Sequence, residues 1–406
     1  MEWKHYKMDE LIEEISMGPF GSDVKKEFYV DNGVPILNGS NLQGFKLKED
    51  SFGYLTKEKA DSLKKCNAHR GDIIVTHRGT LGQIVYVPVN SKYDRYVISQ
   101  SQFRFRCKAD FVDVQYLVYY FHTREGQYKI LANASQVGVP ALARATSTFR
   151  LIDIKLPPLD DQRRIASILS SLDRKIELNN KINADLEEMA QAIFKNWFVD
   201  FEPFKDGKFV DSELGMIPEG WKVGSPYEYV KVVYGAPYKS AKFNDNGEGL
   251  PLIRIRDLKD CNPQFYTPEI LPQTEYVNMG DIVAGMDAEF VPHIWKGNTG
   301  LLNQRVCKLM PQQTSISNLF VLYLMKPELE FVQSYKTGTT VSHLGKADID
   351  KFVVVLPPLK VVEECSKILD SILQRIKNIS AESRNLSTLR DTLLPRLMSG
   401  ELEVPE

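Results

Sequence analysis

Hydrophobic residues recur with heptad spacing in two long stretches of the chain, residues 165–196 and 365–396. Neither apolar stripe can remain in water, and heptads sustained over several turns are typical of paired helices, so the pattern predicts that the two helices pack against each other. Packing of each helix on its own globular part is the alternative. The predicted core positions are Ile165, Leu172, Asn179, Leu186 and Ile193 with Ile168, Lys175, Ile182, Met189 and Asn196 in the first helix, and Cys365, Ile372, Ile379, Leu386 and Leu393 with Ile368, Arg375, Glu382, Leu389 and Arg396 in the second.

The rest of the chain has a strand pattern. Its β-branched runs are short and bounded by Gly, Pro and Asn, which favours strand-rich, mixed cores with a few helices. In residues 103–106 aromatic and basic side chains alternate, and the strand period of two predicts Phe103 and Phe105 on an inner face, with Arg104 and Arg106 facing outward.

The chain also repeats a set of short motifs in the same order. Leu156-Pro157-Pro158-Leu159 returns as Leu356-Pro357-Pro358-Leu359, and each copy precedes one of the helices. Preserved order predicts a duplicated unit, made of a globular part followed by a long helix, rather than one large domain. The other matches are Trp3-Lys4 with Trp221-Lys222, Gly33–Leu37 with Gly249–Ile253, Gly71–Val75 with Gly280–Ala284, and Ile98–Ser101 with Leu302–Arg305.

Composition narrows the class of protein. The 406 residues include 43% hydrophobic and 26% charged residues, and no uncharged apolar run approaches the roughly 20 residues that span a bilayer. The N-terminus lacks the apolar core of a signal peptide and the five cysteines have no paired spacing, so we expect a cytoplasmic protein without a membrane partner. The net charge of −2 gives no general basic field, so any phosphate contact must come from local clusters or from partner subunits.

The motifs that resemble catalytic sites fail on their details. Residues 338–346 are glycine-rich and end in Lys346, but Ala347 stands where a phosphate loop needs Ser or Thr. Asn262-Pro263-Gln264-Phe265 resembles the motif of adenine methyltransferases, yet Gln264 breaks it and no cofactor loop accompanies it. The six histidines lie far apart, so no metal site is predicted.

Polar loop segments at matching places in both halves are candidates for DNA recognition. Asn and Gln can pair with adenine, Arg with guanine, and Asp or Glu can accept from cytosine. Arg104 and Arg106 are better candidates for phosphate contacts, because an outward pair supplies charge without a shaped pocket. The candidate base-reading residues are Asn38, Ser40, Asn41, Thr76, His77, Arg78, Thr80, Gln83, Gln100, Gln102, Arg254, Arg256, Asp257, Asp287, Glu289, Asn303, Gln304 and Arg305.

Nearly the whole chain resembles the DNA-specificity subunits of Type I restriction-modification enzymes. The most specific stretches are Leu156–Asn179, Ala192–Phe201 and Ser212–Trp221, which are similar to the family's central helix and connector. Further similarity to its target recognition domains is found in Gly18–Ser22, Thr76–Gly82, Gly285–Phe290 and Leu302–Arg305. Thr339, Thr340 and His343 are also similar to a segment of these domains, so we add these three residues to the candidate DNA-binding residues. Two departures stand out: Leu359–Glu364 lacks the acidic-Gln-Arg start of the first helix, and Ala288 replaces an expected glycine.

The resemblance implies an α+β fold in which two similar, strand-rich recognition domains are separated by two long helices. It also implies that the helices form an antiparallel, coiled-coil-like pair with pseudo-twofold symmetry. We expect recognition domains at residues 1–155 and 216–355, a central helix at 156–200, a connector at 201–215 and a distal helix at 356–406. The residues expected to pack the helix pair are Ile168, Leu172, Ile182, Leu186, Ile372, Ile379, Leu386 and Leu389.

The function implied by the resemblance is non-catalytic. Each recognition domain would read half of a split site in double-stranded DNA, and the helices would set the gap between the halves. Two methyltransferase subunits would carry S-adenosylmethionine, restriction subunits would use ATP and magnesium, and this chain would hold no cofactor. A coiled-coil adaptor that binds proteins at both ends, and a stand-alone nuclease or methyltransferase, are the alternatives from other classes.

Overall fold

The computed structural model describes residues 3–135, 138–336 and 343–404. Contacts divide the chain into two units, and the division passes through both long helices. The first unit comprises Met1–Lys175 with Leu386–Glu406, and the second comprises Ile176–Asn385. Within the described part of the chain, no helix combines the length and the apolar character that a membrane span requires.

The first unit is built on two sheets with helices packed beside them. The four-stranded sheet is antiparallel, with Phe103 and Phe105 of its second strand fully buried. Its order is β2 (Ile12–Met17), β10 (Gln102–Cys107), β7 (Ile73–Thr76) and β8 (Ile84–Tyr86); the five-stranded sheet has the order β3 (Tyr29–Val30), β5 (Gly53–Leu55), β4 (Val34–Ile36), β9 (Arg95–Val97) and β6 (Asn67–His69). The remaining elements are α1 (Met8–Leu11), α2 (Lys57–Ser62), α3 (Val114–His122), α4 (Arg124–Leu131), β11 (Ala134–Ser135), β12 (Ala141–Leu142) and α5 (Ala145–Arg150).

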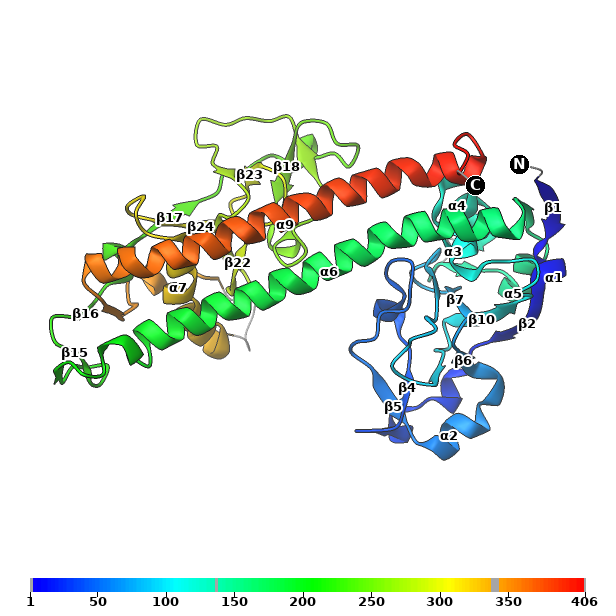
Figure 1. Ribbon diagram of the computed structural model, residues 1–406, viewed down its shortest axis with the longest axis horizontal. Coiled ribbons are helices and arrows are strands. Elements are labelled where there is room, and N and C mark those ends of the chain that lie inside the picture. Colours follow the sequence, from blue (N-terminus) through cyan, green and yellow to red (C-terminus); the bar gives the residue numbers. More distant parts are fainter. Residues whose placement is uncertain (1–2, 136–137, 337–342, 405–406) are drawn as a thin grey trace. The chain divides into compact units, whose positions relative to one another are not determined.

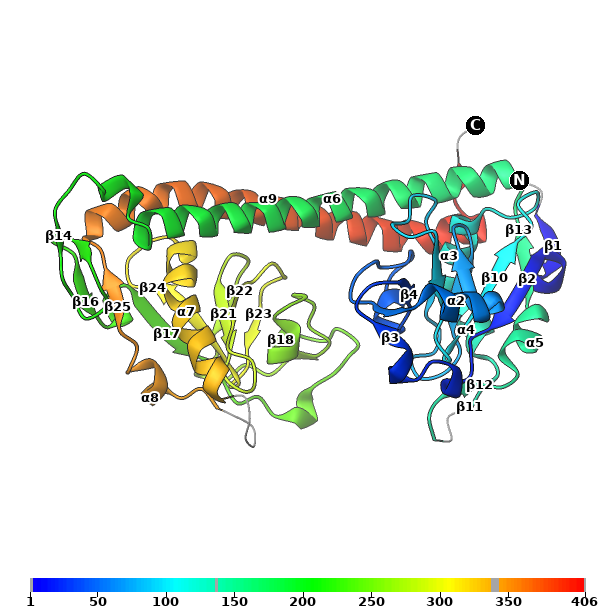
Figure 2. The ribbon, with the colours of Figure 1, turned by 90° about the horizontal axis from the view of Figure 1, so that it is seen from below.

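The second unit repeats this plan. In Figure 2, helix α7 (Asn318–Lys336) runs beside the four-stranded sheet, and buried side chains of both form one apolar core. The order of that sheet is β17 (Val230–Tyr234), β24 (Val306–Pro311), β21 (Ile282–Gly285) and β22 (Pro292–Ile294); the other sheet has the order β19 (Tyr266–Thr267), β18 (Leu250–Ile253), β23 (Gly300–Leu302) and β20 (Tyr276–Val277). The smaller elements are β14 (Phe209–Val210), β15 (Ile217–Pro218) and α8 (Lys346–Ile349).

The repeated sequence motifs pair with one another in the fold. In the first unit, β1 (Lys4–Lys7) pairs with β13 (Asp153–Leu156), and Lys4 lies opposite Leu156. In the second unit, β16 (Lys222–Gly224) pairs with β25 (Val354–Leu356), and Lys222 lies opposite Leu356. In each unit, the strand that follows the Trp-Lys motif therefore pairs with the strand that runs into the Leu-Pro-Pro-Leu motif, and the long helix begins directly after this pair. The predicted duplication is thus confirmed at the level of the backbone.

Another pair of motifs is explained by a turn. Gly71 and Gly280 have φ angles of +84° and +94°, a region that glycine enters at little cost. The aspartate that follows each glycine accepts a hydrogen bond from the backbone three residues before it, His69 N to Asp72 Oδ2 at 2.9 Å and Asn278 N to Asp281 Oδ2 at 2.8 Å. The Gly-Asp-apolar motif thus forms the same turn before β7 in the first unit and before β21 in the second unit.

The two long helices are α6 (Leu159–Phe198) and α9 (Leu359–Ser399), and they lie side by side within each unit (Figures 1 and 2). In the second unit, Asn179 Nδ2 donates to Glu382 Oε2 at 2.9 Å and Asn183 Nδ2 donates to Ser380 Oγ at 3.0 Å. In the first unit, Arg390 Nη1 donates to Asp173 Oδ1 at 2.7 Å. Partner numbers fall along α9 as they rise along α6, so the helices are antiparallel, and their predicted packing together is confirmed.

The predicted seam is displaced by one residue at one of its two core positions. The buried residues there are Leu169, Asn183 and Ala190 in α6 and Leu369 and Ile376 in α9, each one residue after the predicted position. Met189 is 53% exposed, Leu389 is 46% exposed and Ile368 is 42% exposed, so their prediction as seam residues is wrong. The other predicted packing residues are buried (Leu186, Ile372) or half-buried (Ile168, Leu172, Ile182, Ile379, Leu386).

The displacement has a physical cause, because each helix packs on a globular core as well as on its partner. Ile165 and Leu169 of α6 belong to the core of the first unit, together with Leu394 and Leu397 of α9. In the second unit, Phe194 of α6 lies 5.7 Å from the Phe320 ring of α7, measured between ring centroids. The buried face is therefore broader than a coiled-coil seam, and both packing arrangements considered from the sequence occur at once.

The two helix entries use different side chains for the same purpose. Gln162 accepts a hydrogen bond from Asp113 N at 3.0 Å and donates to the carbonyls of Phe111 and Pro157, which ties α6 to the start of α3. In the second unit Val362 is buried, and Ser366 Oγ accepts from Ser317 N at 3.0 Å at the start of α7. The missing Gln of the second motif is thus replaced by a serine one turn further along the helix.

The first unit should lose stability in mild acid through His122. Its Nε2 lies 2.9 Å from Ile84 O, and burial is the main cause that lowers its pKa; Arg390 lowers it further, and Asp173 raises it. Because the unfolded state then binds the proton more readily, stability should fall as the pH drops below about 6.5. We expect His122→Gln to flatten this dependence in thermal unfolding between pH 8 and pH 5.5. The exposed His5→Gln serves as the control, and an unchanged slope in His122→Gln would contradict the assignment.

Candidate nucleic-acid interface

In the first unit, three polar segments meet at one end of the four-stranded sheet. They are the loop after β7, the turn before β10 and the short helix η3 (Gly39–Leu42). The Thr76 hydroxyl donates to Gln83 Oε1 at 3.0 Å, and Gln83 Nε2 donates to Gly39 O at 3.1 Å. Gln102 Nε2 donates to Asn38 O at 3.3 Å. The structure therefore brings together the candidate residues that the sequence placed in separate loops.

Some of these polar side chains hold the loops in place. Asn41 is fully buried; its Oδ1 accepts from Asn38 N at 2.9 Å, and its Nδ2 donates to the carbonyls of Lys48 and Asp50. Gln102 is 1% exposed and accepts from Ser99 N at 2.8 Å. With their amides satisfied inside the protein, these two residues are suited to shaping the loops rather than to pairing with a base.

Other candidates lie on the rim formed by the same segments. Asn38, Ser40, Arg78, Thr80 and Gln100 are exposed. Asn38 Oδ1 accepts from Ser40 N at 2.8 Å, so the two side chains are held close together. Exposed amide and guanidinium groups on a fixed loop have the chemistry that base edges require.

His77, beside this rim, is half-buried. Its Nε2 lies 3.2 Å from Gln100 O, and burial is the main cause that lowers its pKa. A neutral imidazole that donates to a backbone carbonyl fixes the turn and adds no charge to the rim.

The second unit reproduces the loop geometry with charged side chains. Asp257 Oδ2 accepts from Arg254 N at 2.9 Å, the same bond that Asn41 makes to Asn38 N in the first unit. Asp257 is 2% exposed; burial raises its pKa, and the neighbouring Arg254 opposes that shift. The Arg254 guanidinium lies 4.3 Å from the centroid of the Phe265 ring. Arg256 is exposed beside this pair.

Matching backbone hydrogen bonds define equivalent positions in the two units. His77 N donates to Ser101 O in the first unit, and Met286 N donates to Arg305 O in the second, both at 2.9 Å. Leu142 N donates to His77 O at 2.9 Å, and Leu344 N donates to Met286 O at 2.7 Å. It follows that Arg78, Ser101 and Ala141 occupy the places of Asp287, Arg305 and His343. We call these three backbone positions the recognition frame.

One loop of the frame explains a departure noted in the sequence. Gly79 and Ala288 follow Arg78 and Asp287 directly, and their φ angles are +87° and +61°. Ala288 therefore takes a left-handed backbone conformation. Glycine, the residue expected at this place, adopts that conformation more easily than alanine does.

The frame also contains residues 141–142, whose equivalence to His343 and Leu344 was not predicted from the sequence. Residues 141–142 correspond to His343 and Leu344, but Ala141 carries no polar signal, and the distance to the next Leu-Pro-Pro motif differs between the halves. Only the shared backbone bonds reveal the correspondence.

The predicted outward orientation of Arg104 is wrong. Arg104 is 3% exposed, and its guanidinium contacts Asp72 Oδ2 at 3.2 Å and Glu14 Oε1 at 2.6 Å. Arg106 is half-buried and contacts Asp72 Oδ1 at 2.8 Å. The fully buried Asp72 carboxylate draws both arginines inward, so that they face a second layer of protein instead of solvent. In the second unit, Lys308 and Asp281 form the equivalent ion pair at 3.7 Å.

The predicted DNA-binding residues thus divide by exposure. Exposed are Asn38, Ser40, Arg78, Thr80, Gln100, Arg256, Glu289, Gln304, Arg305 and His343. Half-buried are His77, Gln83, Arg106, Arg254 and Asp287. Buried are Asn41, Thr76, Gln102, Arg104, Asp257 and Asn303. Thr339 and Thr340 lie outside the described residues.

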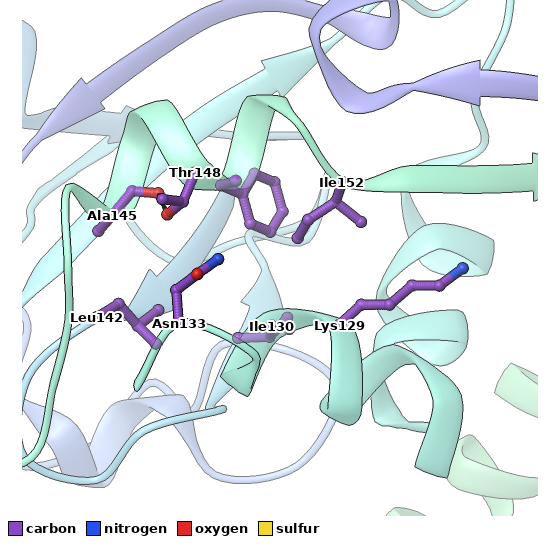
Figure 3. A pocket seen from close by; sticks show the side chains of 8 residues that line it. Lys129, Ile130, Asn133, Leu142, Ala145, Thr148 and Ile152 are labelled. Atoms are coloured by element: carbon purple, nitrogen blue, oxygen red, sulfur yellow. Dashed lines mark hydrogen bonds between the residues drawn. The ribbon is translucent and has the colours of Figure 1, made fainter. Parts of the chain in front are cut away.

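Two cavities lie among the described residues of the first unit. Figure 3 shows a cavity between α4 and α5 that is lined by residues including Ile130, Asn133 and Thr148; its volume is about 10 Å³, room for about one water molecule. A wider hollow of about 340 Å³ beside β4 is lined by residues including Lys57, Tyr93 and Arg95.

The remaining side chains to consider are those that could bind a metal ion and the cysteine thiols. Among the residues that the structure describes, no three His, Cys, Asp or Glu side chains are grouped to hold a metal ion. Burial raises the pKa of Cys107, Cys307 and Cys365 to about 12, so these three thiols stay protonated at neutral pH.

The architecture of the chain is thus a tandem pair of strand-rich units joined to long helices, with polar loops at the sheet ends. The chain belongs to the family described as Type I restriction modification DNA specificity domain, whose model matches residues 1–188 and 218–386. Within Type I complexes this family is the non-catalytic specificity component, and the catalytic cofactors belong to the partner subunits.

Named relatives span the whole chain. It is 27% identical to the MjaIX specificity subunit of a Type I restriction enzyme of Methanocaldococcus jannaschii, covering 100% of this chain and 94% of that protein. It is 22% identical to the HindI specificity subunit of Haemophilus influenzae, covering 99% and 100%. In fold it is similar to the crystal structure of the S subunit of a Type I system from M. genitalium, with a TM-score of 0.54 and 16% identity over 98% of this chain and 96% of that one. That similarity supports the α+β architecture.

Loss of the buried arginine should destabilise the first unit. We expect Arg104→Met to lower the free energy of unfolding by about 3 kcal/mol, because it leaves the buried Asp72 carboxylate with Arg106 as its remaining ion-pair partner. Chemical unfolding measures the change. Arg163→Met, which removes an exposed helix-surface pair with Asp160, is the matched control and should show little effect. Equal stabilities for the two variants would refute the structural role of Arg104.

Proposed function

We propose that this chain reads a bipartite site in double-stranded DNA, with one half-site read by the loops of each unit. The observation that supports the proposal best is the recognition frame, in which the same backbone carries Arg78, Ser101 and Ala141 in one unit and Asp287, Arg305 and His343 in the other. Equal frames with unequal side chains suit the reading of two different short sequences, because base edges are distinguished by the donors and acceptors that face them.

The domain boundaries follow from the same proposal. Recognition domains would occupy residues 1–155 and 216–355, with a central helix at 156–200, a connector at 201–215 and a distal helix at 356–406. Within these ranges, the exposed side chains of the loops described above are the proposed contacts to DNA, and the buried amides Asn41 and Gln102 support them.

The helix pair is the proposed spacer. A helix of 40 residues, such as α6, is roughly 60 Å long at 1.5 Å per residue, which equals the rise of about 18 base pairs of DNA at about 3.4 Å each. A rod on this scale is long enough to determine how many unread base pairs separate the two half-sites.

Partner subunits complete the proposed activity. The net charge of −2 leaves this chain without a general attraction for phosphate, so we propose that two methyltransferase subunits and the restriction subunits supply much of the positive charge that holds the duplex. The methyltransferases would carry S-adenosylmethionine and take up the adenine of each half-site after it is flipped from the helix. The restriction subunits would use ATP and magnesium, and the assembly would work in the cytoplasm.

Exchange of one domain tests this function. Replacing residues 215–355 with those of a relative should change one half-site and leave the other intact, because each frame acts independently. Mapping of methylated adenines in a host that carries the chain with its methyltransferase partner gives both half-sites directly. Methylation without any bipartite motif, or a change in both halves, would overturn the proposal.

Lengthening of the helices tests the spacer. Duplicating the heptad 175–181 in α6 together with the facing heptad 382–388 in α9 keeps Asn183 opposite Ser380, and it adds about 10 Å to the pair. We expect the gap in the methylated motif to grow by about three base pairs, with both half-sites unchanged.

The matched control inserts seven residues in the exposed turn at Asp206–Gly207, and this change should leave the gap as it was. A lengthened helix pair that still recognises the original gap would exclude the spacer role.

A further inference from the structure

Asp287 joins the three positions of the recognition frame in the second unit. His343 Nδ1 lies 2.7 Å from Asp287 Oδ1, and Arg305 Nη1 lies 3.1 Å from Asp287 Oδ2. The Asp287 side chain is 17% exposed, whereas those of Arg305 and His343 are 55% and 49% exposed. One sheltered carboxylate therefore holds two side chains that reach solvent.

The backbone around this carboxylate is fixed as well. Met286 N donates to Arg305 O at 2.9 Å, Leu344 N donates to Met286 O at 2.7 Å, and Glu289 N donates to Asp287 O at 2.7 Å. Asp287 and His343 also form an isolated antiparallel bridge. Because main chain and side chain are both constrained, the Arg305 guanidinium is limited to a small range of positions.

The first unit lacks such a clamp. Arg78 stands at the place of Asp287, with Ser101 and Ala141 at the other two positions, so none of the three carries a carboxylate. Arg78 is exposed and makes no ion pair with any residue in the described ranges. The two frames therefore present a guanidinium in different ways, because Arg305 is held by an ion pair with Asp287 and Arg78 has no such partner among the described residues.

We propose that Asp287 is a positioning residue that holds Arg305 against a guanine in the second half-site. The inference rests on the proposed function and deepens it, since it assigns a base to one side chain. With Nη1 directed to Asp287, the remaining donors of Arg305 can still form the two-pronged contact with O6 and N7 of guanine.

The geometry favours this role over direct reading by Asp287. Both carboxylate oxygens already accept from protein donors, and a sheltered anion facing DNA is tolerated best when cations neutralise it. A guanidinium that touches phosphate alone needs no fixed plane, but one that reads guanine does, because both hydrogen bonds must align. Holding Arg305 in place before binding also reduces the conformational freedom that it must lose.

The test uses the full chain with its methyltransferase partners and duplexes that vary one base at a time in the second half-site. Arg305→Ala should weaken binding to the preferred duplex at least about fivefold and abolish the preference for guanine at one position. Arg305→Lys keeps the charge but loses the planar fork, and it should lose the same preference. Asp287→Asn should reduce that preference, yet add no further loss in the Arg305→Ala background.

Controls separate positioning from folding and from charge. Asp206→Asn removes an equally negative, exposed carboxylate from the second unit and should leave selectivity unchanged. Recognition of the first half-site and the midpoint of thermal unfolding report whether a variant is folded. If Asp287→Asn does not fold, Asp287→Glu takes its place, because it keeps the negative charge and displaces the carboxylate from Arg305, and it should reduce the same preference.

Three results would overturn the inference. Additive losses in the double variant would mean that Asp287 reads a base itself. Full selectivity in Arg305→Lys, or equal weakening of all duplexes with a smaller salt dependence, would mean a phosphate contact. A bipartite motif that is unchanged in Asp287→Asn would reject the clamp alone, whereas a wild-type chain without any bipartite motif would reject the proposed function instead.

Discussion

The fold depends on two amphipathic helices that cannot leave their apolar faces in water. Each of α6 and α9 is longer than any other helix among the described residues, and each is bound along its length by its antiparallel partner and by a globular core. Phe194 and Phe198 of α6 enter the core of the second unit, although the motif that starts this helix belongs to the first. Removing the helix pair would therefore expose part of both cores.

Around this pair, the duplicated units keep their backbone and change their side chains. The turn at Gly71-Asp72 and Gly280-Asp281, the ladder into each helix and the recognition frame are repeated with matching hydrogen bonds. Where the side chains differ, the difference falls into two kinds. The replacement of Gln162 by Ser366 preserves a structural bond, whereas the replacement of Arg78 by Asp287 changes the charge that the loop presents.

Sequence alone predicted the features that rest on local pattern. Helix amphipathicity, the Leu-Pro-Pro-Leu entries and the order of repeated motifs predicted the two units and the pairing of the helices, and the family resemblance implied the α+β class. The candidate residues of the loops were recognised by their residue types at matching places in the two halves, but their approach to one another within each unit was not predicted.

Features that depend on a second layer of protein were out of reach. Strand alternation placed Arg104 outward, but it does not report that Asp72 is buried on that face. Heptad counting placed Leu389 in the seam, but a face that serves two partners is broader than two heptad positions. The division of Asn38 and Asn41 into an exposed and a buried amide likewise follows from tertiary hydrogen bonds that composition does not encode.

The polar contacts inside the helix pair have a consequence for its uniqueness. Asn179 and Asn183 are 1% and 4% exposed, and their side-chain oxygens find no partner among the described residues, although their nitrogens do. Sliding one helix by a heptad would bring Asn183 opposite Leu373 in one direction and Asn179 opposite Leu389 in the other, so one amide nitrogen would lose its partner in either case. These amides thus act as an alignment key: apolar burial alone would accept several offsets of one heptad each, whereas the buried amides favour the offset in which both nitrogens keep their partners.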